Sequence, residues 1–274
     1  DVGHIEGAVP VVKIADNAAK LAALADAVYG EPACGLIGIT GTNGKTTTSY
    51  IIRHFLTRAG IRAGVIGTVA YEFESRSVPA TRTTPDVFET YHLATRMARS
   101  GADMVVMEVS SHALAQGRIG NLMFDAAVFT NLTQDHLDYH HTMDEYFRAK
   151  RRLFKRVRGG GRWSCERPAV VGCEDAWGRR LATECREEGP HPLTYCLAPE
   201  RPCDVRASDV VLGRDGSRFA LTWFGEDAGE VRSRLLGRHN IANCLAAMAV
   251  TAQMGIELDA LREYARDIPP VPGR

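Results

Sequence analysis

Short apolar runs alternate with amphipathic stretches along most of the chain. Residues 36–40 form an apolar run, and after a glycine-bearing turn Ile51, Ile52 and Phe55 recur at helical spacing within residues 45–58. The same strand, loop and helix pattern then repeats. Further strands are predicted at 63–68, 104–108, 126–130 and 169–172, and further helices at 86–99, 143–154 and 175–188. This alternation predicts an α/β fold with a mostly parallel, doubly wound sheet that has helices on both faces.

The last third of the chain has a different pattern. Residues 205–236 contain short runs rich in Val, Leu, Phe and Trp that are interrupted by glycines, which predicts a small antiparallel sheet. Two helices are predicted after it, at 240–254 and 258–266. Residues 268–274 read I-P-P-V-P-G-R, a composition typical of a linker between domains.

Composition narrows the classes of function. The chain has 274 residues, and its 33 basic and 33 acidic side chains cancel, without a basic tract that would favour nucleic acid as a partner. No apolar run approaches the ~20 residues of a membrane span, and residues 1–13 lack the pattern of a signal peptide. The seven cysteines are scattered, without a C-x-x-C pair, so we expect neither a disulfide framework nor a zinc site. A reducing cytoplasm is the predicted location.

The clearest chemical motif is the glycine-bearing turn between the first predicted strand and helix. It reads Gly41, Thr42, Asn43, Gly44, Lys45, Thr46, Thr47. Glycines let the backbone turn tightly and direct N–H groups at an anion. By position, Lys45 would reach the outer phosphates of a nucleotide, and the Thr46 hydroxyl would contact magnesium. The spacing departs from G-x-x-x-x-G-K-[S/T], because Ile39 stands five residues before Gly44, so the motif is a variant phosphate loop that predicts binding of ATP or GTP.

Six further strings accompany this loop. They are T-T-P-D at 83–86, E-V-S-S-H-A-L at 108–114, T-N-L-T-Q-D-H-L-D-Y-H at 130–140, Y-F-R-A-K at 146–150, G-R-H-N-I-A-N at 237–243 and V-P-G-R at 271–274. Together with G-T-N-G-K-T-T, they make the chain resemble the Mur ligase family, and within it the MurE type, UDP-N-acetylmuramoyl-tripeptide synthetase. The resemblance covers roughly residues 35–274.

The resemblance implies one part of a three-domain enzyme. Residues 1–34 resemble the tail of the N-terminal UDP-substrate domain and a linker, and residues 35–274 resemble the central ATP-binding domain. The C-terminal domain, which selects the amino acid in this family, is expected to be absent. The implied enzyme is a monomeric, cytoplasmic ligase of peptidoglycan synthesis, and so of cell wall biogenesis, cell shape and division. It uses ATP to add diaminopimelate or lysine to UDP-N-acetylmuramoyl-L-alanyl-D-glutamate through an acyl phosphate, and the sequence leaves the choice of amino acid open.

The resemblance also assigns the catalytic and metal-binding groups. Lys45 and Glu108 would act at the phosphates, with Glu108 and Thr46 on one magnesium ion. His136 would bind a second magnesium ion. Magnesium prefers oxygen ligands, so the residues alone would favour Asp135 or a transition metal instead.

Lys150 is the lysine that becomes carbamylated by carbon dioxide in the family, and the carbamate helps to bind the second magnesium ion. Without the resemblance, the basic residues around Lys150 would predict a solvated helix face. Carbamylation requires the neutral amine, which burial of a lysine favours.

Binding residues follow from the same comparison. The positions that would contact the UDP-N-acetylmuramoyl-dipeptide are Thr83, Thr84, Ser110, Gln116 and Arg118, which offer hydroxyls, an amide and a guanidinium. Ser110 lacks a G-x-S-x-G context, so it is not expected to be a hydrolase nucleophile.

Asn240 and Asn243 would contact the adenine edge, although Asn240 could instead cap the helix. One departure from the family pattern is present. The usual N-x-D-D is replaced by Gly172-Cys173-Glu174-Asp175, so no role is expected for the missing asparagine.

Two alternatives remain at this point. Another ligase of the superfamily, of the folylpolyglutamate or cyanophycin synthetase type, shares the phosphate loop and the magnesium glutamate. The T-T-P and S-S-H-A-L strings favour the cell-wall enzyme. A nucleotide-binding fragment without catalysis is the second alternative, and it would bind nucleotide without the phosphate release that a ligase shows when its substrate is added.

Overall fold

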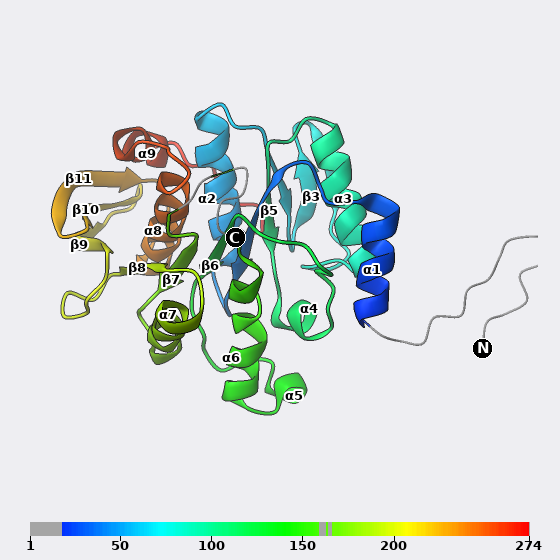
Figure 1. Ribbon diagram of the computed structural model, residues 1–274. Helices are drawn as coiled ribbons and strands as arrows, with labels where there is room; N and C mark the ends of the chain where they lie inside the picture. Colours follow the sequence, from blue (N-terminus) through cyan, green and yellow to red (C-terminus); the bar gives the residue numbers. More distant parts are fainter. Residues whose placement is uncertain (1–17, 159–162, 164–165, 274) are drawn as a thin grey trace, which may run out of the picture.

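One continuous sheet runs through the computed structural model, which describes residues 18–158, 163 and 166–273 (Figure 1). Its eleven strands within these residues lie in the order β11-β10-β9-β8-β7-β6-β1-β5-β2-β3-β4. The strands are β1 (Gly35–Thr40), β2 (Ala63–Ile66), β3 (Ala70–Phe73), β4 (Arg76–Pro79), β5 (Met104–Glu108), β6 (Ala126–Phe129), β7 (Ala169–Gly172), β8 (Pro192–Cys196), β9 (Val205–Leu212), β10 (Ser217–Trp223) and β11 (Glu226–Ser233).

The six central strands, β2, β5, β1, β6, β7 and β8, are parallel. Helices cover both faces, so these strands are buried along their whole length and mostly apolar, as parallel strands usually are. The helices are α1 (Ala18–Tyr29), α2 (Lys45–Arg58), α3 (Val87–Arg99), α4 (Ser111–Ala115), α5 (Leu137–His140), α6 (Met143–Arg151), α7 (Ala176–Glu188), α8 (Arg238–Ala252) and α9 (Leu258–Ala265). The predicted α/β fold class is confirmed.

Each face of the sheet has its own apolar core. Side chains of α2, α8 and α9 pack on one face, around Ile37, Val106 and Val128. Side chains of α1, α3, α6 and α7 pack on the other face, around Val105 and Phe129. Alternate residues of the same strands therefore serve both cores, and the sheet is held between two layers of helices.

The antiparallel strands β9, β10 and β11 extend the main sheet. Tyr195 of β8 pairs in parallel with Val205 of β9, and the three strands then continue as a meander. The sequence predicted the meander but not its continuity with the parallel strands. At the opposite edge, β2 and β3 pair antiparallel, as do β3 and β4, and neither β3 nor β4 was predicted.

Several predicted boundaries need correction. The strand expected at 63–68 ends at Ile66, so Gly67 and Thr68 lie beyond it. The helix expected at 143–154 ends at Arg151 and is followed by a short 3-10 turn, Phe154–Arg156. Strand β8 and the helices α1, α4 and α5 were not predicted at all.

Helix α1 lies in the segment that the sequence assigns to a preceding domain, and it packs against α3. The Tyr91 hydroxyl donates to Asp26 Oδ1 at 2.5 Å, and the Asn121 amide donates to Asp26 Oδ2 at 2.5 Å. The boundary at residue 34 stays a prediction, and residues 1–17 of the same segment lie outside the described part of the chain.

Two of the cysteines form a bond that the sequence did not predict. Cys196 and Cys203 are joined by a disulfide across the loop between β8 and β9. The scattered cysteines did not suggest a disulfide framework, and this pair corrects that expectation for Cys196 and Cys203, which lie seven residues apart. Cys34, Cys173, Cys185 and Cys244 are buried, whereas Cys165 lies outside the described residues.

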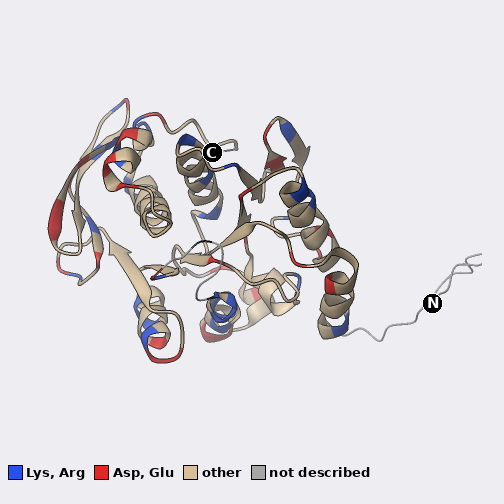
Figure 2. Cartoon of the chain, turned by 45° about the horizontal axis from the view of Figure 1, so that its top comes forward, with Lys and Arg blue, Asp and Glu red and all other residues tan. Residues whose placement is uncertain are grey.

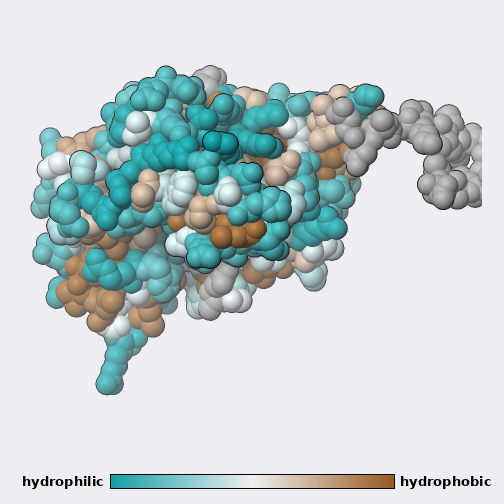
Figure 3. Space-filling model, turned by 90° about the horizontal axis from the view of Figure 1, so that it is seen from below, coloured by the Kyte–Doolittle hydropathy of each residue, from teal (hydrophilic) through white to brown (hydrophobic). Residues whose placement is uncertain are grey.

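The surface is mixed in character. Seen from below, it is mostly hydrophilic, with hydrophobic areas at the centre and on the side that carries the antiparallel strands (Figure 3). None of the described helices is both long enough and apolar enough to cross a membrane.

Candidate functional site

The loops that follow β1, β5 and β6 meet at one edge of the sheet. Strand pairing places Ile39 opposite Glu108 and Thr40 opposite Phe129, so the carboxyl ends of the three strands are level. In open α/β sheets, ligands bind outside the carboxyl ends of the strands. The phosphate loop, Glu108 and the string that contains His136 are therefore neighbours.

Two glycines of the phosphate loop have conformations that other residues adopt rarely. Gly41 has a φ of +150° and Gly44 a φ of +87°. A Cβ atom at Gly41 would collide with the Thr130 hydroxyl, and one at Gly44 would collide with the Asn243 amide oxygen. The loop thus needs glycine for its turn and for close packing, and it leads directly into the N-terminus of α2, where unpaired N–H groups favour an anion.

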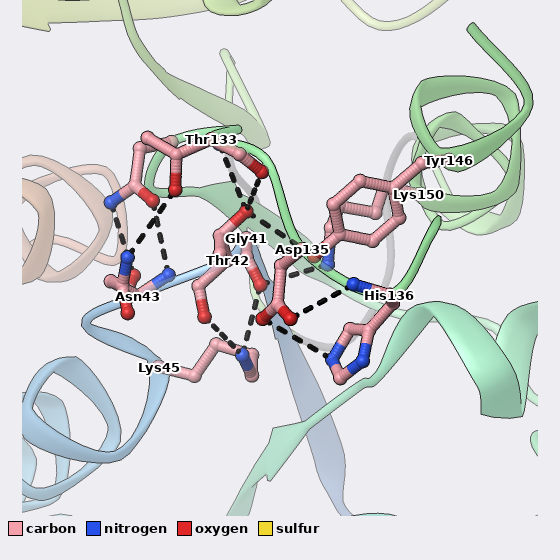
Figure 4. Close-up of polar contacts among 10 residues, drawn as sticks. Gly41, Thr42, Asn43, Lys45, Thr133, Asp135, His136, Tyr146 and Lys150 are labelled. Atoms are coloured by element: carbon pink, nitrogen blue, oxygen red, sulfur yellow. Dashed lines mark hydrogen bonds and ion pairs between the residues drawn. The ribbon is translucent and has the colours of Figure 1, made fainter. Parts of the chain in front are cut away.

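The loop that follows β6 holds the phosphate loop in place. The backbone N–H groups of Thr42 and Asn43 donate to the backbone and side-chain oxygens of Asn131 at 2.9 and 3.0 Å. The Thr130 hydroxyl donates to the Asn43 carbonyl at 2.6 Å. Thr133 closes the contact, since its backbone N–H donates to the Thr42 hydroxyl at 3.0 Å (Figure 4). Asn131 and Thr130 belong to a string noted in the sequence, but the sequence did not predict their role as a brace.

Lys45 folds back over the phosphate loop. Its Nζ donates to the carbonyls of Gly41 and Thr42, each at 2.9 Å. The ammonium group therefore lies at the concave side of the loop, where it would neutralise a bound phosphate.

Glu108 lies at the end of β5 and is fully buried. Its Oε2 accepts hydrogen bonds from the hydroxyls of Thr46 and Thr68, each at 3.0 Å, and its Oε1 accepts one from the Thr68 N–H at 2.9 Å. A buried carboxylate is stable only when such donors or a cation compensate its charge. Thr68 was missed as a site residue because the sequence assigned it to a strand.

Lys150 is among the most buried charged residues of the chain, with 1% of its surface exposed. Its Nζ donates to the Gly41 carbonyl at 2.8 Å and lies 4.6 Å from the centre of the Tyr146 ring. Burial, and next the positive charge of Lys45, lower the pKa of Lys150 well below its usual value. The solvated helix face that the residues alone would predict is wrong for this position, and a larger neutral fraction of the amine follows.

His136 stands at the edge of the same site, with 44% of its side chain exposed. It has a φ of +52°, and its backbone N–H donates to Asp135 Oδ1 at 2.8 Å. Its Nε2 lies 3.5 Å from Asp135 Oδ2. The edge of the His136 ring contacts Tyr146, whose hydroxyl lies 3.2 Å from the Thr42 hydroxyl (Figure 4). His136 and Lys150 thus flank one tyrosine that contacts the phosphate loop.

Two more histidines, absent from the sequence-based prediction, pack beside His136. The His112 ring centre lies 4.8 Å from that of His136 and 5.5 Å from that of His140. Burial lowers the pKa of both additional histidines, that of His140 to about 4. The lowered pKa values favour the neutral form of His112 and His140 at pH 7.

The five predicted substrate residues form a connected wall beside Glu108. Thr84 donates its hydroxyl to the Glu108 carbonyl at 2.9 Å and accepts from the Ser110 N–H at 3.0 Å. Arg118 donates to the Thr84 carbonyl at 3.3 Å and to the Gln116 amide oxygen at 2.5 Å.

Thr83 joins this wall to Glu108 through Thr68, whose hydroxyl lies 3.1 Å from that of Thr83. The Ser110 hydroxyl accepts from the Ala113 N–H as the N-cap of α4.

A cavity of about 570 Å³ opens between the phosphate loop and the start of α8. This volume lies in the range of small-molecule sites. It is lined by Asn43, Gly44, Thr47, Thr130, Asn131, Tyr195, His239, Asn240, Ala242 and Asn243. Both predicted asparagines therefore face the same space as the phosphate loop, and Tyr195 and His239 were not predicted.

Asn240 does not cap α8, because the helix begins at Arg238 and its N-cap is Gly237. The alternative role that the sequence left open for Asn240 is therefore wrong. Its Nδ2 donates to the Leu236 carbonyl at 2.8 Å, and its Oδ1 accepts from Asn243 at 3.2 Å. Asn243 in turn accepts from the Thr48 hydroxyl at 3.3 Å, which connects α8 to α2.

The segment that departs from the family pattern has structural partners. Asp175 caps α7 by accepting from the Gly178 N–H at 2.7 Å, and its other oxygen accepts from the Leu132 N–H at 2.8 Å. Glu174 accepts from the backbone N–H of Ala198 at 3.1 Å. Asp175 therefore supports the loop after β6, which in turn holds the phosphate loop.

Residues 39–251 match the family model described as the Mur ligase middle domain. The chain is 42% identical over 267 residues to the UDP-N-acetylmuramoyl-L-alanyl-D-glutamate--2,6-diaminopimelate ligase of Geobacter sulfurreducens, covering 96% of this chain and 51% of that protein. It is also 42% identical over 272 residues to the ligase of the same name from Geobacillus thermodenitrificans, covering 97% and 54%. The chain thus spans about half the length of these relatives.

Two solved structures of Mur ligases are similar to this chain in fold. The structure of a UDP-N-acetylmuramoyl-L-alanyl-D-glutamate--2,6-diaminopimelate ligase is similar with a TM-score of 0.80 and 29% identity, over 94% of this chain and 51% of that chain. The structure of MurF from Acinetobacter baumannii is similar in fold, with a TM-score of 0.67 and 18% identity over 94% of this chain and 50% of that chain.

Proposed function

Because the chain belongs to the Mur ligase family, we propose that it carries the ATP-binding centre of an amide ligase that adds the third amino acid to UDP-N-acetylmuramoyl-L-alanyl-D-glutamate. The observation that carries the proposal is the convergence of two buried groups on the phosphate loop. Glu108 reaches it through Thr46, and Lys150 reaches it through the Gly41 carbonyl. A simple nucleotide-binding module does not need a second, buried lysine at the loop.

The reaction needs activation of a carboxylate, since hydroxide is a poor leaving group. Transfer of a phosphoryl group from ATP gives an acyl phosphate, and the incoming amine then displaces phosphate. Such chemistry depends mostly on positioning and on compensation of negative charge. Lys45 supplies positive charge at the phosphate loop, and the backbone N–H groups at the start of α2 orient the phosphates.

The groups around Glu108 fit a magnesium ion. Magnesium is usually bound by one or two carboxylates together with phosphate oxygens and water, which matches a site that offers the Glu108 carboxylate and the Thr46 hydroxyl. The ion neutralises phosphate charge when it is bound. Among the described residues, no group of three or more His, Cys, Asp or Glu side chains could hold a metal ion by itself, so phosphate oxygens would complete this coordination.

Lys150 and His136 are proposed to serve a second magnesium ion. Carbon dioxide reacts with a neutral amine, and the lowered pKa of Lys150 favours that form. The ammonium group first loses one proton. The neutral amine nitrogen then bonds to the carbon of carbon dioxide and loses a second proton, which leaves a carboxylate-like carbamate. The carbamate would lie close to Lys45, since both lysines contact Gly41.

The remaining residues are proposed to bind the two substrates. Thr83, Thr84, Ser110, Gln116 and Arg118 would hold the UDP-N-acetylmuramoyl-dipeptide, and Asn240 and Asn243 would contact adenine. The relatives are named for 2,6-diaminopimelate, so we propose this amino acid as the third residue. We also propose a cytoplasmic, monomeric enzyme of peptidoglycan synthesis, with amino-acid selection outside these 274 residues.

Phosphate release tests the proposal. The chain would be assayed with ATP and magnesium, with and without UDP-N-acetylmuramoyl-L-alanyl-D-glutamate, beside Lys150→Ala and with added bicarbonate. We expect release that this substrate stimulates and that the variant loses. ATP binding without release would indicate a nucleotide-binding fragment that requires the rest of the protein, and failure to bind ATP would contradict the site assignment.

A further inference from the structure

A second hollow of about 600 Å³ lies away from the phosphate loop, between the turn joining β9 to β10 and the C-terminal end of α9. We call it the arginine pocket. Its lining residues are Val211, Gly213, Arg214, Asp215, Gly216, Ser217, Arg218, Arg232, Ser233, Arg234 and Arg266. The lining thus includes five arginines, and Figure 2 shows basic and acidic segments close together on these strands.

The positive charge of the pocket is only partly compensated. Glu230 is shared by two arginines, Arg232 at 2.6 Å and Arg218 at 3.4 Å. Arg266 pairs with Glu263 at 3.0 Å. Arg214 and Arg234 make no ion pair or side-chain hydrogen bond with any described residue, and Asp215 is the one carboxylate in the lining. The arginines therefore exceed the carboxylates, and their mutual repulsion favours binding of an anion.

The backbone around the two unpaired arginines is fixed. Gly216 has a φ of +146°, and a Cβ atom there would collide with the Ser233 carbonyl, so the turn packs directly on β11. The Gly213 N–H donates to the Gly216 carbonyl at 2.8 Å. The floor is closed by Ser217, whose hydroxyl donates to the Leu235 carbonyl at 2.8 Å. Arg214 and Arg234 thus extend from a rigid frame, and binding would order only their side chains.

We propose that the arginine pocket binds a multivalent oligophosphate anion. Guanidinium groups bind phosphate oxygens in pairs and remain charged at every physiological pH, which suits a hollow lined by several arginines to a ligand with several phosphate groups. Exposed ion pairs such as those of Glu230 contribute only about 0–1 kcal/mol, so a phosphate can displace them. The proposal is independent of the ligase assignment, because none of the pocket's residues belongs to the phosphate loop or the substrate wall.

Inorganic pyrophosphate is the probe, titrated calorimetrically without divalent metal and at constant ionic strength. The unmodified chain is expected to bind at two sites, because the phosphate loop also binds this anion. Lys45→Ala should leave the arginine pocket as the remaining site. Adding Arg214→Gln and Arg234→Gln to Lys45→Ala should weaken this remaining binding at least tenfold.

The matched control removes two arginines elsewhere. Arg96 and Arg99 are exposed on α3 and pair with no acidic side chain among the described residues, so Arg96→Gln with Arg99→Gln removes the same charge. The control should leave the remaining pyrophosphate affinity within twofold. No binding in Lys45→Ala, or an equal loss in the control, would overturn the proposal.

If Lys45→Ala fails to fold, the pyrophosphate titration is repeated with Arg214→Gln and Arg234→Gln together in the otherwise unmodified chain. The number of pyrophosphate sites should then fall from two to one. An unchanged number of sites would overturn the proposal.

Discussion

Lys45 and Lys150 donate to the same main-chain carbonyl, that of Gly41, at 2.9 and 2.8 Å. Two ammonium groups on one acceptor repel each other, and only one of them is buried. The repulsion shifts the protonation of Lys150. Its pKa is lowered well below its usual value, first by burial and then by the charge of Lys45. Charge at the phosphate loop and protonation of Lys150 are therefore coupled.

The lowered pKa of Lys150 predicts a pH dependence of stability. The unfolded chain binds the Lys150 proton up to about pH 10.5, whereas the folded chain releases it at lower pH. The unfolded state binds more protons in this window, so the free energy of unfolding should rise with pH, by up to about 1.4 kcal/mol per unit. Urea unfolding of the wild-type chain and Lys150→Met at pH 8, 9 and 10, in buffer free of carbon dioxide, measures it.

Lys150→Met should lack the part of the increase in unfolding free energy with pH that comes from Lys150. Lys155→Met is the control, because Lys155 is exposed a few residues further along the same segment. A parallel pH dependence in wild type and Lys150→Met would contradict the assignment of Lys150 as a buried amine that is largely neutral when folded.

Gly44→Ala should reduce nucleotide affinity more than backbone strain alone explains. At Gly44 the new methyl group combines a φ of +87° with a collision against the Asn243 oxygen. At Gly60 the φ is +81°, but no atom lies within 4 Å of the new group. Both variants should lose about 1 kcal/mol of stability to strain. Only Gly44→Ala should weaken ATP binding, by at least tenfold in equilibrium titration, and equal affinities of the two variants would contradict the packing argument.

The sequence predicted the central strands and the phosphate loop because both depend on local pattern. Buried parallel strands are continuous apolar runs, and a glycine-bearing turn before a helix indicates an anion site. It failed for β3, β4 and β8, since residues 70–79 are largely polar for strands and β8 begins with a proline. Strands at the edge of a sheet, and strands that pair with segments distant in the sequence, show only weak periodicity of apolar residues in the sequence.

The contact of Lys150 with the phosphate loop could not be predicted from local sequence pattern, for a different reason. Arg148, two residues earlier on the same helix, is 68% exposed, whereas Lys150 is 1% exposed. Lys150 follows Tyr146 and Phe147 at helical spacing and so lies on the buried face of α6. Its contact with the Gly41 carbonyl depends on the placement of β1 beside β6, which residues 143–151 do not encode. The family resemblance predicted carbamylation of Lys150, which stays a prediction. Burial of this lysine lowers its pKa and so favours the neutral amine that carbamylation needs.

Glu108→Gln should separate magnesium binding from nucleotide binding. The amide keeps an oxygen acceptor for Thr46 or Thr68 but removes the negative charge, and its NH₂ group faces a donor. We expect the gain in ATP affinity that magnesium provides to fall at least tenfold, with a smaller change in its absence. Glu187→Gln, on the exposed end of α7, is the control and should behave as wild type. An undiminished magnesium effect in Glu108→Gln would rule out Glu108 as a ligand.

Asp175→Ala tests whether the segment that departs from the family pattern supports the nucleotide site. The change removes the cap of α7 and leaves the Leu132 N–H without its acceptor. Loss of a cap costs about 1 kcal/mol, and a buried unpaired donor adds about 1–3 kcal/mol. The loop after β6 should then loosen, and because Asn131 of this loop holds Thr42 and Asn43, the Kd for ATP should rise several-fold.

Asp86→Ala provides the comparison, because Asp86 caps α3 through the Glu89 N–H at 3.0 Å without contacting the loop after β6. It should lose stability in urea unfolding while its ATP affinity stays within twofold of wild type. If both variants lose stability and neither loses ATP affinity, Asp175 acts only as a helix cap. If Asp175→Ala loses ATP affinity and Asp86→Ala does not, Asp175 positions the phosphate loop. It does so through the loop after β6, the strand beside β7.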